Sequence, residues 1–157
     1  MLHSRTADIR EARRIAAHEC GHALVRWATG VPIALMTIVG VDGVRGRVSG
    51  AFDDLDSDAD YFNRIVVLVA GHIGEKHHLG ESKGLKGSDR RKVDDCAACL
   101  ADNANARSLI VRAAEIEAEH LLRKHEQAFR SLIDALLARS VLSGGQVTEI
   151  IERETPV

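Results

Sequence analysis

Hydrophobic residues recur at helical spacing along most of this chain, so most of it is predicted to be helical. The pattern predicts helices over about residues 9–30, 60–79, 88–103, 107–140 and 147–153. The second helix contains an apolar run from Ile65 to Ala70, which predicts that it is buried on all sides. Gly71 and Gly74 follow that run, and we expect them to let the first helix approach closely. The fourth region is either one long helix or two helices that break near Lys124.

Between the first two helices the pattern changes to β-branched and apolar residues. Residues 33–41 and 44–50 are predicted strands, and Asp42-Gly43 between them is typical of a two-residue hairpin turn. The chain is therefore predicted to have a mainly α fold with a small β-hairpin or sheet, which is the α+β class. A length of 157 residues suits one domain, and no repeat or low-complexity segment divides residues 1–157.

Polar residues mark where some of the predicted helices begin and end. Asp8 and Glu11 have the spacing of a capping box, which predicts that the first helix begins near residue 9. Ser143 and Gln146 have the same spacing before the last helix. Gly30 follows the last apolar position of the first helix, which is typical of a helix C-terminus.

Composition and charge narrow the class of protein. Hydrophobic residues make up 45% of the chain and charged residues 28%, which is typical of a folded globular domain. The net charge of −2 and the lack of a basic patch argue against a nucleic-acid partner. The longest apolar run is too short to span a bilayer, and the first residues lack the apolar core of a signal peptide. Three cysteines at no disulfide-like spacing fit a reducing compartment, so we expect a cytoplasmic protein without a membrane segment.

The first predicted helix contains His18-Glu19-Cys20-Gly21-His22, a His-Glu-x-x-His (HExxH) motif. Residues four apart lie on one face of a helix, about one turn apart, so both imidazoles can bind the same cation. Glu19 then lies beside that cation, where a carboxylate can handle the protons of an activated water. Catalytic zinc sites keep three protein ligands, whereas structural zinc sites are closed by four, so the motif favours an enzyme.

A third ligand has to come from elsewhere in the chain. A histidine six residues after the second one, as in metzincins, is excluded because position 28 is Ala. Glu75, in the second predicted helix, could supply a carboxylate as in thermolysin-like sites. Asp89, at the start of the third predicted helix, is the other candidate, and the residues alone leave both open.

Further motifs accompany the His-Glu-x-x-His in a fixed order. They are His18-Glu19-Cys20-Gly21-His22-Ala23, Gly30-Val31-Pro32, Thr37-Ile38-Val39, Gly46-Arg47-Val48, Ala70-Gly71-His72-Ile73-Gly74-Glu75, Gly87-Ser88-Asp89 and Leu142-Ser143-Gly144-Gly145-Gln146-Val147. This series covers about residues 8–152 and resembles the peptidase domain of the FtsH family, the M41 zinc metallopeptidases. The first motif is shared by many families, whereas the ordered series is much more specific.

The resemblance implies a zincin-like helical fold and one zinc ion per chain. The zinc ligands that it implies are His18, His22 and Asp89. Asp94 and Asp95 are the alternatives to Asp89, because the loop before this helix can be aligned in more than one way. Glu75 then orients a ligand imidazole, and Glu19 is the general base.

The predicted function is that of a zinc-dependent metalloendopeptidase, which hydrolyses peptide bonds in unstructured polypeptide. Members of the family generally carry a membrane segment and an AAA ATPase, but this sequence has no Walker A motif. We therefore expect a free-standing protease domain that takes unfolded substrate or works with a separate ATPase or adaptor. One strand of the predicted hairpin could bind the substrate as an added strand. The alternative is a zinc-binding regulatory or assembly module with little or no turnover, and the helical region 107–140 leaves a homo-oligomer open.

Overall fold

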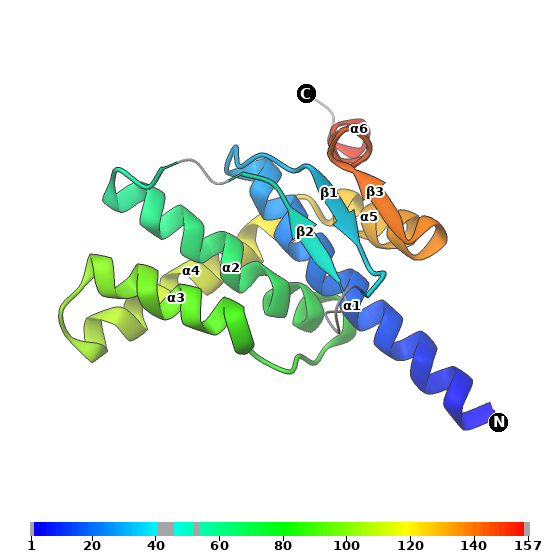
Figure 1. Ribbon diagram of the computed structural model, residues 1–157, viewed down its shortest axis with the longest axis horizontal. Coiled ribbons are helices and arrows are strands. Elements are labelled where there is room, and N and C mark those ends of the chain that lie inside the picture. Colours follow the sequence, from blue (N-terminus) through cyan, green and yellow to red (C-terminus); the bar gives the residue numbers. More distant parts are fainter. Residues whose placement is uncertain (1, 41–45, 52–53, 156–157) are drawn as a thin grey trace.

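A computed structural model of the chain describes residues 2–40, 46–51 and 54–155 and confirms a mainly helical α+β fold. Within these residues there are six helices and three short strands (Figure 1). The helices are α1 (Leu2–Ala28), α2 (Asp58–Leu79), α3 (Gly87–Leu100), α4 (Ala104–Lys124), α5 (Glu126–Arg139) and α6 (Gly144–Glu154). The strands are β1 (Leu35–Thr37), β2 (Arg47–Ser49) and β3 (Val141–Ser143).

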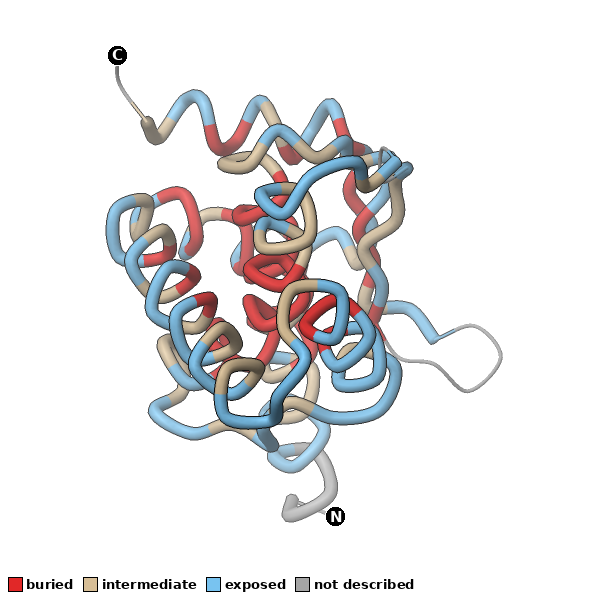
Figure 2. Tube along the Cα trace, turned by 90° about the vertical axis from the view of Figure 1, so that its left-hand side faces the viewer, coloured by how far each residue is buried: buried red, intermediate tan, exposed pale blue. Residues whose placement is uncertain are grey.

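Helix α2 is the central helix of the fold, and α1, α3 and α4 all pack against it (Figure 1). Every residue of α2 from Ile65 to Glu75 is buried, as the apolar run predicted. Helices α5 and α6 pack on each other and against α1, so α1 contacts both groups of helices. Buried residues concentrate in the interior, while exposed residues cover the outer helices (Figure 2).

Helices α1 and α2 approach each other closely where both carry glycine. A Cβ atom added to Gly21 of α1 would lie 2.2 Å from the carbonyl oxygen of Ala70 in α2. A Cβ atom added to Gly74 of α2 would lie 2.6 Å from the carbonyl oxygen of Ala17 in α1. These distances are far inside van der Waals contact, so the expected close approach is confirmed.

The three strands form one antiparallel sheet in the order β2-β1-β3. The predicted pairing of the first two strands is confirmed, with Met36 opposite Val48. The predicted turn at Asp42-Gly43 lies outside the described residues. The third strand, which the sequence did not predict, places Leu142 opposite Met36 on the other side of β1. Met36 and Leu142 are fully buried, so this face of the sheet packs on the core, and β2 remains at the edge.

Four of the predicted helix boundaries are wrong by three residues or more, namely the starts of α1, α4 and α6 and the end of α3. Helix α1 begins at Leu2, so the capping-box spacing at Asp8 lies inside the helix. No Pro or Gly in residues 2–7 interrupts the helix, and a capping side chain matters only where the chain enters one. The third helix ends at Leu100 instead of residue 103, because Asn103 caps α4 by accepting a hydrogen bond from the N–H of Ala106.

The other boundaries agree more closely with the sequence. The region 107–140 is two helices that meet at His125, one of the two alternatives left open. Ser143 and Gln146 form the predicted capping box at the start of α6. Gly80 ends α2 with a positive φ of 77°. In the part of the chain that the structure describes, no helix is both apolar and long enough to cross a bilayer.

Candidate metal centre

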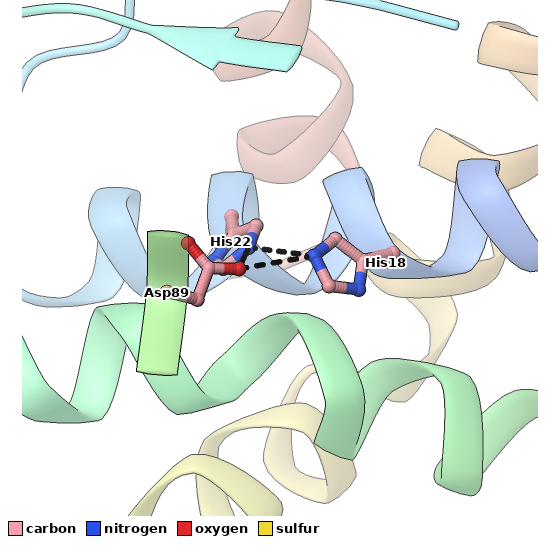
Figure 3. A group of neighbouring side chains, drawn as sticks. All are labelled: His18, His22 and Asp89. Carbon is pink, nitrogen blue, oxygen red and sulfur yellow. Dashed lines mark hydrogen bonds and ion pairs between the residues drawn. The ribbon is translucent and has the colours of Figure 1, made fainter. Parts of the chain in front are cut away.

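The side chains of His18 and His22, both on α1, meet that of Asp89 from α3 (Figure 3). The Nε2 atoms of the two imidazoles are 3.1 Å apart. Each lies 3.3 Å from the same carboxylate oxygen, Oδ2 of Asp89. Asp89 reaches this point because it belongs to the first turn of α3, which packs against α2 beside α1. Three potential ligand atoms from two segments about 70 residues apart therefore surround one point.

The other ring nitrogen of each histidine is held by a hydrogen-bond acceptor. Nδ1 of His18 lies 2.7 Å from Oε1 of Glu75, and Nδ1 of His22 lies 2.7 Å from the carbonyl oxygen of Val67. A carbonyl and a carboxylate accept hydrogen bonds, so Nδ1 carries the proton in each ring. A bound metal ion would replace the Nε2 protons that bond to Asp89 in the metal-free site, and each neutral imidazole would then present the lone pair of its Nε2 atom.

Space for an ion comes from Gly71 in α2. A Cβ atom added there would lie 2.5 Å from Nε2 of both His18 and His22. Any other residue at this position would fill the place where the ligand atoms converge. The glycine that we expected to serve helix packing is therefore also part of the candidate site.

The donor set fits a zinc ion. Ligand atoms placed tetrahedrally about 2.05 Å from zinc lie roughly 3.3 Å from one another. The three observed separations are 3.1, 3.3 and 3.3 Å. Two imidazole nitrogens and one carboxylate oxygen are ligands that zinc takes readily, whereas calcium and magnesium favour oxygen alone. Three protein ligands leave a fourth position for water or substrate.

The electrostatics of the site favour a bound cation. Burial disfavours the charged form of His18, but hydrogen bonds with Asp89 and Glu75 outweigh it and raise the pKa of His18 to about 9. Burial also opposes the ionisation of Asp89, but hydrogen bonds from the two imidazoles hold its pKa well below its usual value. The pKa of Glu75 is lowered for the same reason, by His18 above all. Both carboxylates are therefore anionic at neutral pH, and positive charge here is stabilised.

Glu19 is almost completely buried beside the histidines. Only 6% of the residue is exposed, and it lines the same cleft as the three candidate ligands. Burial raises the pKa of Glu19, although the nearby charges of His22 and His18 oppose the shift. The backbone of Gly46, just before β2, passes directly against it, and an added Cβ atom would lie 2.7 Å from its Oε1 atom. Burial therefore makes Glu19 more easily protonated than an exposed glutamate.

Four acidic residues were candidates for the third metal ligand, and they lie at different places in the structure. Asp89 lies against the Nε2 atoms, whereas Glu75 lies behind His18 at Nδ1, on the far side of the ring. Asp94 pairs with Arg90 at 3.2 Å on the exposed side of α3, and Asp95 is also exposed. Asp89 is the acidic residue placed to complete the ligand set, and Glu75 is placed to orient His18.

Two interactions of the site were not predicted. His22 contacts the backbone carbonyl of Val67, and a backbone group cannot be recognised from the type of residue. Only the packing of α1 on α2 reveals this contact. Arg14 donates a hydrogen bond to Oε1 of Glu75 at 3.1 Å and also pairs with Glu11. A signal for Arg14 did exist, because it lies four residues before His18 on the same face of the helix.

The metal centre opens into a long cleft of about 910 Å3. Helix α1 contributes a row of residues spaced four apart, and α2 and α3 line the cleft as well. The edge strand β2 and the flanking Gly46 and Gly50 also line it. The cleft is large enough to take a segment of polypeptide along β2.

Comparison with models of protein families finds no family that this chain matches, and a search of curated proteins finds no matching protein either. The function therefore has to be inferred from the geometry of the site.

Proposed function

We propose that this chain is a zinc-dependent metalloendopeptidase with a zincin-like fold, similar to the peptidase domain of the FtsH family (M41). The observation that carries the proposal is the convergence of His18, His22 and Asp89 at separations suited to zinc, above a glycine that leaves room for the ion. Glu19 directly follows the first of these ligands in the sequence and lines the same cleft. A purely structural zinc site has no use for such a buried carboxylate.

The chemistry divides between the metal and the residues of the chain. When bound, zinc supplies a Lewis acid that polarises a peptide carbonyl and makes water easier to deprotonate. His18 and His22 would hold the ion through Nε2 and Asp89 through its carboxylate, while Glu75 and the carbonyl of Val67 fix the two rings. Glu19 accepts the proton of the attacking water on its carboxylate and later delivers it to the leaving amine.

The substrate is unstructured polypeptide because the cleft offers a strand edge. Strand β2 lies at the edge of the sheet in the described structure and lines the cleft, and the backbone of Val48 bonds to Glu19, so a peptide paired with the rest of this edge would lie beside Glu19. Gly46 and Gly50 flank β2 along the cleft, and an added Cβ atom at Gly46 would meet Ile15 and Glu19, so this glycine lets β2 pass close to the candidate metal centre. A folded protein does not present the free backbone that this pairing needs.

The test is hydrolysis of casein, which is largely unfolded, by the zinc-loaded protein. We expect cleavage that a chelator abolishes and added zinc restores. Glu19→Gln should bind the same amount of zinc but reduce the rate at least about 100-fold, since general-base catalysis contributes that much or more. Glu117→Gln, on an exposed glutamate of α4, is the matched control and should retain the wild-type rate.

The outcomes separate the two functions that the sequence allows. Hydrolysis by Glu19→Gln at the wild-type rate would refute the role of Glu19. Stoichiometric zinc binding without any turnover of casein or peptides would refute the peptidase and favour the regulatory or assembly module.

A further inference from the structure

The backbone of β2 contacts the proposed general base directly. The backbone N–H of Val48, in the middle of β2, donates a hydrogen bond to the carboxylate of Glu19. A Cβ atom added to Gly46, just before β2, would lie 2.7 Å from Oε1 of Glu19 and 2.6 Å from Cγ2 of Ile15. Gly46 also has a positive φ of 86°, which glycine adopts at little cost. The glycine therefore lets β2 come close enough for Val48 to reach Glu19.

The pairing of β2 with β1 independently places the N–H of Val48 on the free edge of the strand. The carbonyl oxygen of Ser49 accepts a hydrogen bond of 2.8 Å from the N–H of Ala34, just before β1, so the main chain of Ser49 faces β1. Adjacent residues of an antiparallel strand direct their main-chain groups to opposite sides. Val48 therefore directs both its N–H and its C=O group away from β1, toward the cleft that it lines.

This hydrogen bond fixes a group whose orientation matters for the reaction. A general base works only if its acceptor oxygen stays within hydrogen-bond reach of the proton that it takes. The N–H of a paired strand cannot rotate as a side-chain donor can, so it holds the carboxylate of Glu19 firmly in one place. The donor also lies on the strand with which the substrate peptide is proposed to pair.

We propose that Val48 is a positioning residue, whose backbone N–H holds Glu19 in the orientation that takes a proton from the attacking water. This inference rests on the proposed function and adds a residue to its mechanism. The carbonyl group of Val48 stays available to the substrate, so one residue aligns the general base with the peptide. The role belongs to the main chain, so the type of side chain at this position does not indicate it.

The experiment removes one N–H group and leaves the side chain unchanged. Val48 is replaced by its α-hydroxy acid through nonsense suppression, which turns the peptide bond before it into an ester. The carbonyl group of Val48 belongs to the next peptide bond and remains an amide carbonyl. The zinc-loaded proteins are assayed for kcat and KM with a quenched fluorescent peptide from casein, and their zinc affinities are measured separately.

Val141 of β3 offers a matched control. It is also a valine in a three-residue strand, and β3 lies at the other edge of the described sheet. The carbonyl oxygen of Ser140 accepts a hydrogen bond of 3.0 Å from the N–H of Ile38, so the next residue, Val141, directs its main chain away from β1. Strand β3 contributes none of the described residues that line the cleft. An ester at Val141 therefore tests the general effect of an ester in an edge strand.

We expect the ester at Val48 to lower kcat about 10- to 100-fold, the effect of losing a hydrogen bond to a charged group. KM should stay near the wild-type value, because the carbonyl group of Val48 is retained, and zinc affinity should not change. In Glu19→Gln the same ester should reduce the residual rate little further, since the two changes remove one function. The ester at Val141 should keep the wild-type kcat.

Hydrogen exchange tests the same contact without any turnover. An N–H on the free edge of a strand exchanges readily unless it has an acceptor. The amide of Val48 should therefore be protected in the metal-free wild type and in Glu19→Gln, which keeps an acceptor oxygen. In Glu19→Ala, which has no acceptor, the protection should be lost.

Failure of the inference and failure of the proposed function give different results. Wild-type kcat in the Val48 ester, or an equal loss in the Val141 ester, would overturn the inference and leave the peptidase standing. An equal further loss in Glu19→Gln would also overturn it, because Val48 would then act on another group. Equal exchange of the Val48 amide in wild type and Glu19→Ala would have the same consequence. No hydrolysis of any peptide by the wild type would refute the peptidase, and the role of Val48 with it.

Discussion

At the scale of single residues, the candidate metal centre depends on Glu75, which holds the ring of the candidate ligand His18. Glu75 is only 1% exposed, and it accepts hydrogen bonds from His18 and Arg14 on Oε1 and from the backbone N–H of Lys83 on Oε2. A buried carboxylate with three donors cannot easily turn away. It therefore fixes the ring of His18 and increases the basicity of its Nε2 atom.

Glu75→Gln should weaken zinc binding roughly tenfold, the lower end of the range for losing such a partner. The amide keeps an acceptor for Nδ1 but loses the negative charge. Zinc affinity is measured by competition with a fluorescent chelator, with Glu117→Gln as the control. An unchanged affinity would show that Glu75 only packs between α1 and α2.

A second residue-scale prediction concerns Glu11 and acid. A hydrogen bond from Arg14 lowers the pKa of Glu11 to about 2, against burial, with help from the charges of Arg14 and Lys83. Its folded-state pKa lies below the unfolded value of 4.5, so its contribution to stability is full above pH 4.5 and is lost as the pH falls toward 2. Glu11→Gln lacks this contribution.

The free energies of unfolding of wild type and Glu11→Gln, measured in urea, should therefore differ by a constant amount between pH 5 and 7. The difference should shrink progressively below pH 4.5. A difference that does not change with pH would contradict the assigned interaction.

The residues of the candidate site differ in how well the sequence predicts them. His18, Glu19 and His22 belong to one helical turn, so their spacing alone predicts that they act together. Asp89 comes from another helix, so the residues alone did not decide whether Asp89 or Glu75 is the third ligand. Only the family resemblance favoured Asp89. The contact of His22 with the carbonyl of Val67 was beyond prediction, because every residue has such a carbonyl.

At the scale of elements, strands were harder to predict than helices. The hairpin of β1 and β2 was predicted because both strands are close in the sequence and are rich in β-branched residues. Strand β3 is as short as β1 and β2, but its partner β1 is about a hundred residues away, so no neighbouring strand or turn in the sequence indicates it. Helix ends were misjudged where two signals competed, as at Asn103, which ends one helical region and caps α4.

The packing of α1 on α2 gives an element-scale prediction that separates stability from metal binding. In Gly74→Ala the new methyl group meets the backbone of α1 at Ala17 and Gly21, which cannot move without shifting the helix. In Gly71→Ala the nearest atoms belong to the imidazoles of His18 and His22, so the strain falls on two hydrogen-bonded side chains and not on the backbone of α1. The two variants carry the same chemical change three residues apart in one helix.

We expect Gly74→Ala to lose roughly 1–3 kcal/mol of unfolding free energy, as overpacked cores do. Gly71→Ala should keep most of the stability of the metal-free protein, because its strain falls on side chains and alanine favours the helix by up to about 1 kcal/mol. Its zinc affinity should fall at least tenfold. Chemical denaturation of the metal-free proteins and zinc titration test this, and wild-type zinc affinity in Gly71→Ala would contradict the placement of the ion.

At the scale of the whole molecule, the metal centre joins segments that are distant in the sequence. The ligands come from α1 and from the first turn of α3, and the two helices are connected by β1, β2, α2 and the loop after α2. The unfolded chain does not hold these ligands together. An ion that binds only the folded chain therefore stabilises the whole fold.

Zinc at about 100 times its dissociation constant should add about 2.7 kcal/mol to the unfolding free energy. For a domain of this size, that corresponds to a rise of roughly 5–10 °C in Tm. Asp89→Asn keeps the shape of the side chain but removes the charged ligand and its pairing with the two imidazoles, so its metal-free Tm should fall below that of wild type. Its further rise with zinc, measured from its own metal-free Tm, should be much smaller. An equal rise in Asp89→Asn would mean that the ion binds elsewhere, for instance at His77 and His78 in the last turn of α2. Zinc should raise the Tm whatever the substrate is, because the effect depends only on the linkage between binding and folding. Calorimetry therefore tests the metal site without a substrate.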